Sequence, residues 1–126
     1  MSAPQSAALT AITFQLAAAL DQYDLQFDAL LRNWPDMDAY QGVSKGIDEL
    51  RLYTAALPEL SVAYVSLLIA HAEVVHCLWK RSNAQACTEE QFAGARDAHR
   101  VAVAGLRRRC LRALAEQTEK NGGRRQ

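Results

Sequence analysis

"LTAITFQLAAALDQYDLQFDALLRNW", residues 9–34, carries apolar side chains that recur in alternating steps of four and three. This is the spacing of a coiled-coil seam, in which every seventh residue returns to nearly the same side of a helix. It predicts a helix from about Ser6 to Trp34, ended by Pro35. Such a helix would be about 40 Å long, and any protruding part would need a partner to cover its seam. The two interleaved sets are Leu9, Leu16, Tyr23 and Leu30, and Thr13, Leu20, Phe27 and Trp34.

The rest of the 126-residue chain is also rich in alanine and leucine, and it shows no alternating pattern typical of a strand. We expect further helices over about Asp38–Leu57, Pro58–Ser82 and Glu89–Lys120. The predicted fold class is therefore all-α: a single domain, residues 1–126, forming a small bundle of about four helices with long first and last helices. Residues 1–5 and 121–126 are expected to be disordered.

Local signals refine two of these helices. Gly42 and Gly46 each cost about 1 kcal/mol relative to alanine inside a helix. The first part of the second helix is therefore predicted as a loop, with Ser44 capping the regular segment that follows. "TEEQ", residues 88–91, matches a capping box at the start of the last helix. "NGG", residues 121–123, is expected to end that helix.

"IAHAEVVHCLW", residues 69–79, holds the residues most suggestive of chemistry. On a helix, His71 and Glu73 lie about 160° apart, and His71 and His76 are five residues apart, so neither pair shares a face. Glu73 and His76 form half of a di-iron bundle motif, and the chain has no second Glu-x-x-His. We expect no catalytic residue, no metal site and no cofactor. His71 is predicted to be a hydrogen-bonded core or interface histidine.

Three cysteines, Cys77, Cys87 and Cys110, make an odd count without a repeated spacing. They are predicted to be reduced thiols of a cytoplasmic protein. The first twenty residues lack the basic region of a secretory signal. The apolar run over residues 61–79 includes Glu73, whose burial in a bilayer would cost about 2.5–3.5 kcal/mol. We therefore expect no membrane partner.

Charge is balanced over the whole chain, with 14 basic and 14 acidic residues, but unevenly placed. Residues 1–60 carry eight acidic and three basic residues, and residues 96–126 carry nine basic and three acidic residues. The two regions could attract each other within one chain or between two copies, and the second arrangement favours antiparallel self-association. The arginines at 107–109 fan over about 200° of a helix. We therefore expect no nucleic-acid partner.

A long heptad helix, a mostly apolar third helix and the absence of a catalytic pattern are typical of a protein that works by binding proteins. We expect a homodimer. The predicted interface combines seam residues of the first helix with arginines of the last helix as an ionic rim: Leu16, Leu20, Tyr23, Phe27, Leu30, Trp34, Arg108 and Arg112.

Three segments in succession carry a family resemblance. They are the long first helix broken at "NWPD" (residues 33–36), "IDELRLYTAALPELSVAYVSLLIAHAEVVHCLWKRS" (residues 47–82) and an arginine-rich last helix. Together they resemble the QslA-like small helical antiactivators. The resemblance covers most of the chain and rests on overall pattern and size, without a short diagnostic motif.

The resemblance implies a non-enzymatic regulator of transcription in quorum sensing. Such an antiactivator binds a LuxR-type transcription regulator and blocks the dimerisation and DNA binding of that activator. Two alternatives stay open at this point: a helical chaperone or adaptor for another protein, and a metal-binding helical bundle that uses Glu73, His76 and His99.

Overall fold

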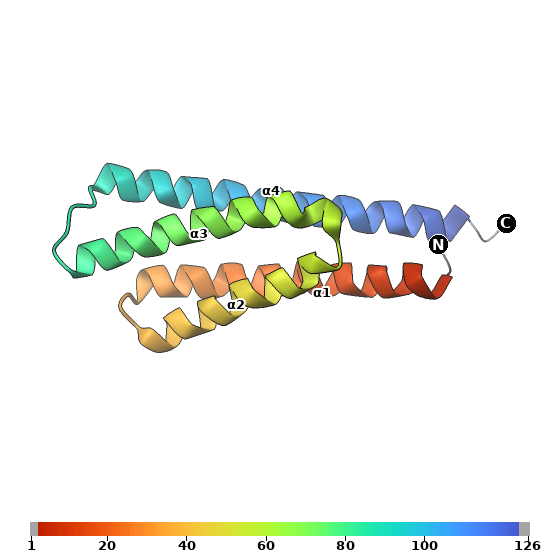
Figure 1. Ribbon diagram of the computed structural model, residues 1–126, viewed down its shortest axis with the longest axis horizontal. Helices are drawn as coiled ribbons and strands as arrows, with labels where there is room; N and C mark the ends of the chain where they lie inside the picture. The colour runs from red at the N-terminus through yellow and green to blue at the C-terminus, as the bar shows by residue number, and fades with distance from the viewer. Residues whose placement is uncertain (1–2, 124–126) are drawn as a thin grey trace.

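A computed structural model describes residues 3–123 and shows four helices packed as an antiparallel bundle (Figure 1). The fold is all-α with long first and last helices, as predicted, and residues 3–123 contain no β-strand. The elements are α1 (Ala3–Arg32), α2 (Met37–Ala55), the 3-10 turn η1 (Pro58–Leu60), α3 (Ser61–Ser82) and α4 (Glu89–Gly123).

The two long helices, α1 and α4, lie side by side and extend together beyond α2 and α3 (Figure 1). The predicted seam of α1 is buried, with Leu16, Leu20 and Leu30 fully inaccessible to solvent. In the extension, the Sγ of Cys110 lies 3.8 Å from the carbonyl oxygen of Thr13. The expectation that a protruding α1 needs a second molecule is therefore wrong, because α4 of the same chain covers the seam.

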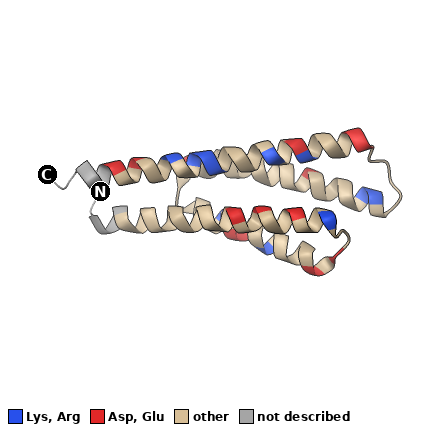
Figure 2. Cartoon of the chain, turned by 180° about the vertical axis from the view of Figure 1, so that it is seen from behind, with Lys and Arg blue, Asp and Glu red and all other residues tan. Residues whose placement is uncertain are grey.

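Opposite charges also meet within one chain, along the contact between α1 and α4 (Figure 2). The guanidinium of Arg107 donates to the carboxylate of Asp21 at 2.8 Å and lies 3.5 Å from that of Asp24. The acidic first half and the basic last helix thus attract each other intramolecularly at this point. Exposed ion pairs of this kind add at most about 1 kcal/mol each.

The start of α2 differs from the prediction. The helix begins at Met37, where the carboxylate of Asp36 accepts hydrogen bonds from the backbone N–H groups of Asp38 and Ala39. Gly42 and Gly46 therefore lie inside the helix instead of in a loop. A Cβ on Gly46 would lie 3.3 Å from Cδ1 of Tyr23, so this glycine allows α2 to pack closely against α1.

One prediction about the ends of α4 is confirmed, and at the other end the helix extends a few residues beyond the predicted bound. The capping box forms: the Thr88 N–H donates to Oε1 of Gln91 at 2.9 Å, and the Gln91 N–H donates to Oγ1 of Thr88 at 3.0 Å. At the other end the helix is described through Gly123, three residues beyond the predicted end at Lys120. Residues 3–5 and 121–123, predicted to be disordered, are helical, while residues 1–2 and 124–126 lie outside the described residues.

The apolar helix α3 occupies a corner of the bundle and is not central to it. It packs mainly against α4 and buries Tyr64, Leu67 and Val74, while Val62 and Ile69 remain exposed. In the described part of the chain, Pro58–Ser82 is the one stretch long and apolar enough to cross a membrane. That is weak support for a membrane span, because apolar helices of soluble bundles meet the same criterion.

The two glycines of α2 give a matched test of this packing. Gly42→Ala should raise the free energy of unfolding by up to about 1 kcal/mol, because alanine favours a helix and the nearest side-chain atom is 3.9 Å away. Gly46→Ala should gain less or lose stability, because Tyr23 would have to move. Urea denaturation of both variants measures the difference. Equal gains in both would contradict close contact between α1 and α2 at Gly46.

Candidate functional site

The polar centre of the bundle is the hydroxyl of Tyr23 on α1, which is fully buried. It lies 2.7 Å from Nδ1 of His71 on α3 and 2.9 Å from Nε2 of His99 on α4. The prediction that His71 is a hydrogen-bonded histidine is confirmed. Its partners were missed, although a tyrosine at a seam position signals that its hydroxyl needs a bond when buried.

This geometry fixes how the protons are shared. The hydroxyl of Tyr23 has one proton to donate, so only one of the two ring nitrogens facing it can be the acceptor. The other ring must carry a proton on its facing nitrogen and donate it to the hydroxyl oxygen. Two neutral imidazoles with opposite roles satisfy both contacts.

The surroundings favour the neutral forms. The ring of Phe27 stacks on His99 with centroids 3.9 Å apart, and His99 is 4 % exposed. Burial lowers the pKa of His71 to about 4, partly offset by Asp48. Burial, helped by His71 and Arg100, likewise lowers the pKa of His99 to about 4. Burial also raises the pKa of Tyr23, so its phenol stays protonated.

We call Tyr23, His71 and His99 the triad, and the space found beside it is small. The hollow beside His99, lined also by Phe27, Asp24 and Arg96, has a volume of about 10 Å³, near the smallest space that holds one water. Among residues 3–123, no three histidine, cysteine or acidic side chains are placed to hold a metal ion. This arrangement is suited to holding helices together.

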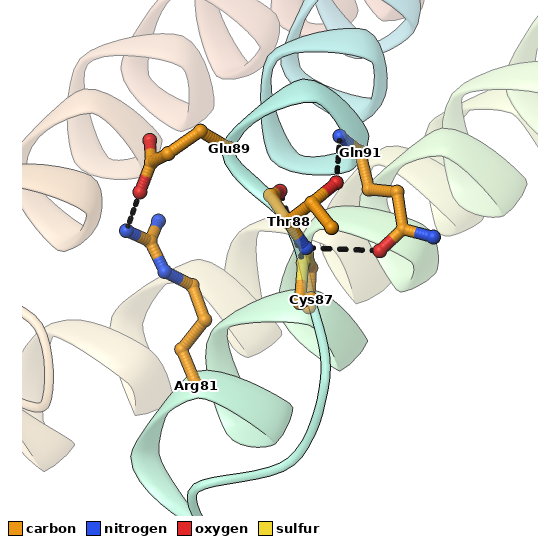
Figure 3. Close-up of a disulfide and its surroundings, with 6 residues drawn as sticks. Arg81, Cys87, Thr88, Glu89 and Gln91 are labelled. Carbon is orange, nitrogen blue, oxygen red and sulfur yellow. Dashed lines mark hydrogen bonds and ion pairs between the residues drawn. A yellow bond between two sulfur atoms is a disulfide. The ribbon is translucent and has the colours of Figure 1, made fainter.

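Cys77 of α3 and Cys87 of the following loop form a disulfide, with their Cα atoms 5.8 Å apart (Figure 3). The prediction that both are reduced thiols is therefore wrong. The loop after Ser82 turns back along α3 and brings two cysteines ten residues apart together. Arg81 and Glu89 form an ion pair across the same connection. Cys110 is a free, buried thiol, and burial raises its pKa to about 11.

A hollow of about 280 Å³ adjoins this disulfide, between α3 and α4. Glu73, His76 and Lys80 line it, so the two residues of the half di-iron motif point toward a surface hollow. His99 lies instead in the core beside Tyr23. The structure therefore does not bring His99 together with Glu73 and His76.

The predicted interface residues fall into two groups. The five seam residues are buried in the monomer core, which offers no surface to a partner at Leu16, Leu20, Tyr23, Phe27 and Leu30. Trp34 is half-buried, donates a hydrogen bond to Oγ of Ser82 and packs edge-on against Trp79. Arg108 and Arg112 are exposed on α4. The five buried seam residues therefore pack within the chain itself, while an interface at Trp34, Arg108 and Arg112 stays a prediction.

An exposed apolar surface lies instead along the outer side of α3 and α4, and we call it the α3–α4 face. Its groove, with a volume of about 480 Å³, runs between Ile69 and Glu73 of α3 and Ala98 and Val101 of α4. Ile69 is 56 % exposed and Val101 is 70 % exposed. Val62 and Val65, which also lie on α3, are exposed as well but do not line the groove.

Exposure of this kind is typical of a binding surface. Single apolar side chains on a surface are normal, whereas a contiguous apolar patch bordered by polar residues marks a place of interaction. Small residues on α4, Ala98 and Ala102, line the groove and leave space between the helices. A helix laid into the groove would contact both walls.

No protein-family model, no curated protein and no solved structure matches this chain.

Acid should destabilise the bundle through the two buried histidines. Because the pKa values of His71 and His99 are about 4 instead of 6.5, the unfolded chain binds protons between these values that the folded chain does not. The free energy of unfolding should stay constant above about pH 7 and fall toward pH 4, by up to about 1.4 kcal/mol per pH unit for each histidine. Urea titrations at several pH values measure the slope.

Two variants test whether the buried histidines cause this change of the free energy of unfolding with pH. His99→Gln should make the pH dependence shallower, because one buried titrating ring is removed. His76→Gln changes an exposed histidine of α3 and controls for the loss of an imidazole as such. An unchanged slope in His99→Gln would contradict the assignment.

Reduction should also destabilise the protein. The disulfide closes a short loop of the unfolded chain, and such a constraint is worth about 2–4 kcal/mol. A reducing agent should therefore lower the urea midpoint of the native chain and of Cys110→Ser, but not that of Cys87→Ser. Equal midpoints for the native chain with and without reductant would argue against the Cys77–Cys87 bond.

Proposed function

We propose that this protein is a non-enzymatic antiactivator that binds a LuxR-type transcription activator and prevents its dimerisation and DNA binding. The observation that carries the proposal is the α3–α4 face, an open and mostly apolar groove. The class of partner comes from the resemblance of the sequence to QslA-like antiactivators. A cytoplasmic location is part of the same proposal and rests on that resemblance alone; the Cys77–Cys87 disulfide is a kind of bond more usual in oxidising compartments.

The physical basis is competition for an apolar surface. An activator that works as a dimer has a self-contact, and dimer contacts are typically apolar at their centre. The groove beside Ile69 and Val101 could cover such a surface on one activator subunit. A subunit covered in this way could not pair with a second subunit, and it would lose the two-fold symmetric contact with DNA.

The polar core supports this role indirectly. The triad of Tyr23, His71 and His99 joins three helices by side-chain hydrogen bonds, and the hollow beside His99 has a volume of only about 10 Å³, which suits a rigid scaffold. A rigid face loses little conformational entropy when it binds, which favours affinity.

A mobility-shift assay with a ligand-bound LuxR-type activator and its promoter DNA tests the proposal. Adding the native protein should abolish the DNA complex. Ile69→Glu should restore it, because a carboxylate buried in an apolar contact without a partner is strongly unfavourable. Leu52→Glu, at a similarly exposed position on α2, should inhibit like the native chain.

Two results would contradict the proposal. One is that the native protein leaves the DNA complexes of LuxR-type activators from its own cell unchanged. The other is that affinity capture recovers an exported protein and no transcription regulator, which would favour a helical chaperone.

A further inference from the structure

We infer that the Cys77–Cys87 disulfide and the hollow beside it form a site for thiol–disulfide exchange with a small thiol that carries both an amino group and a carboxylate. The inference goes beyond the proposed function, because it concerns this bond and not the groove of the α3–α4 face. Three observations carry it: the bond borders an open space, charges of both signs line that space, and the loop that supplies Cys87 contains a strained residue.

The bond is open to a small molecule from one side. Both cysteines line the hollow of about 280 Å³ between α3 and α4, a volume near the lower end of ligand pockets. Cys77 is buried on α3, whereas Cys87 is half-buried at the end of the loop (Figure 3). A thiolate that enters the hollow therefore meets Cys87 more readily than Cys77. A disulfide enclosed in a core would offer no such approach.

The hollow carries one group for each charge of an amino acid. Glu73 and Lys80 both line it, seven residues apart and thus on nearly the same side of α3. Among the described residues, neither side chain forms an ion pair within 4 Å. The carboxylate of Glu73 can bind an ammonium group, and the ammonium group of Lys80 can bind a carboxylate.

Other polar groups complete the lining of the hollow. His76 of α3 and Gln91 of α4 both border it and offer further hydrogen-bonding atoms. The Cα atoms of Glu73 and Lys80 are about 10 Å apart along the helix axis, and both side chains are long enough to lean toward a ligand between them. A thiol with two opposite charges therefore complements this hollow better than a neutral or singly charged thiol.

The loop before Cys87 is held in a conformation that its sequence does not favour. At the end of α3 a Schellman motif forms, in which the Gln85 N–H donates to the carbonyl oxygen of Lys80 at 2.7 Å. That motif needs a left-handed residue, usually glycine, and here the residue is Ala84 with a φ of 56°. An alanine is strained in this region. Cutting the bond to Cys77 allows the turn to relax, which favours reduction.

The exchange takes two steps. The thiolate of the small molecule attacks Sγ of Cys87 and forms a mixed disulfide there, while the bond to Cys77 breaks and Cys77 leaves as a thiolate that takes up a proton. A second thiolate then attacks the sulfur of the bound molecule and releases Cys87, which is protonated in turn. Two small thiols are thus oxidised to their disulfide, and the protein disulfide is reduced to two thiols.

The site also bears on the proposed cytoplasmic location. Disulfides of cytosolic proteins are usually transient, and they serve catalysis or redox sensing. An exchangeable bond would follow the thiol pool of the cell instead of staying closed. Because Glu73 lines both this hollow and the groove of the α3–α4 face, a thiol bound here would lie at one end of that face.

Rates of reduction of the native chain and of charge variants test the inference. Cysteamine carries only the amino group, 3-mercaptopropionate only the carboxylate, and 2-mercaptoethanol neither. Each rate is divided by the thiolate concentration and by the rate with 2-mercaptoethanol, which removes differences common to all thiols. Alkylation stops the reaction, and mass spectrometry counts the reduced fraction.

Each variant should affect one thiol. Glu73→Gln should lower the relative rate of cysteamine about three-fold, and Lys80→Gln should lower that of 3-mercaptopropionate about three-fold, because each removes one exposed charge contact. Cysteine should be slowed in both variants. Lys45→Gln changes an exposed lysine of α2 and should leave all relative rates as in the native chain.

Trapping identifies the sulfur that is attacked. In Cys77→Ser with Cys110→Ser, Cys87 is the remaining cysteine, and it should form a mixed disulfide with added cystine and release one cysteine. In Cys87→Ser with Cys110→Ser, the buried Cys77 should react at least about ten-fold more slowly. Circular dichroism checks that each variant is folded, and the rates of the native chain do not depend on these variants.

Three results would overturn the inference. One is a rate of reduction that does not rise with thiol concentration, since the bond would then be reached only after the chain unfolds. Another is a set of relative rates that Glu73→Gln and Lys80→Gln leave unchanged. The third is faster trapping at Cys77 than at Cys87. All these readouts come from the chain alone, so the proposed function can fail without them, and they can fail without it.

Discussion

Burial of one hydroxyl group, that of Tyr23, constrains how three of the four helices lie. A phenol hydroxyl removed from water without a hydrogen bond costs several kcal/mol, so its partners must reach it. Those partners come from α3 and α4, at 2.7 Å and 2.9 Å. A shift of either helix by one turn, about 5.4 Å, would break a contact. Apolar side chains alone would tolerate such a shift more easily, because their attraction has little direction.

The same triad responds unequally to a first and a second proton. If one histidine becomes charged, the hydroxyl of Tyr23 can still accept from it and donate to the other ring. If both are charged, both facing nitrogens carry protons, and the hydroxyl proton of Tyr23 has no acceptor between them. Two cations would then also lie close to one buried oxygen. The packing of the core thus depends most strongly on the second protonation.

The parts of the structure that could be predicted from sequence are those set by local spacing. The seam of α1 follows from seven-residue periodicity, and the Thr88–Gln91 capping box from a pattern of four residues. Apart from the start of α2, which the neighbouring Asp36 caps, the missed parts depend on contacts between distant segments. Tyr23 is 48 and 76 residues from its histidines, and the need for a glycine at position 46 comes from the close approach of Tyr23 on α1. The Cys77–Cys87 bond needed the path of the connecting loop, which a spacing of ten residues does not define.

The polar core and the outer face are linked through the rotation of α3. This helix is apolar around most of its circumference, so hydrophobic burial alone would permit several rotations, each hiding a different stripe. Two polar contacts select one of them: His71 with Tyr23, and the hydroxyl of Tyr64, which donates to the backbone carbonyl of Ile47 at 3.1 Å. With these made, Ile69 must point outward. The side chains that a partner would meet are therefore chosen inside the bundle, by hydrogen bonds that the partner never contacts.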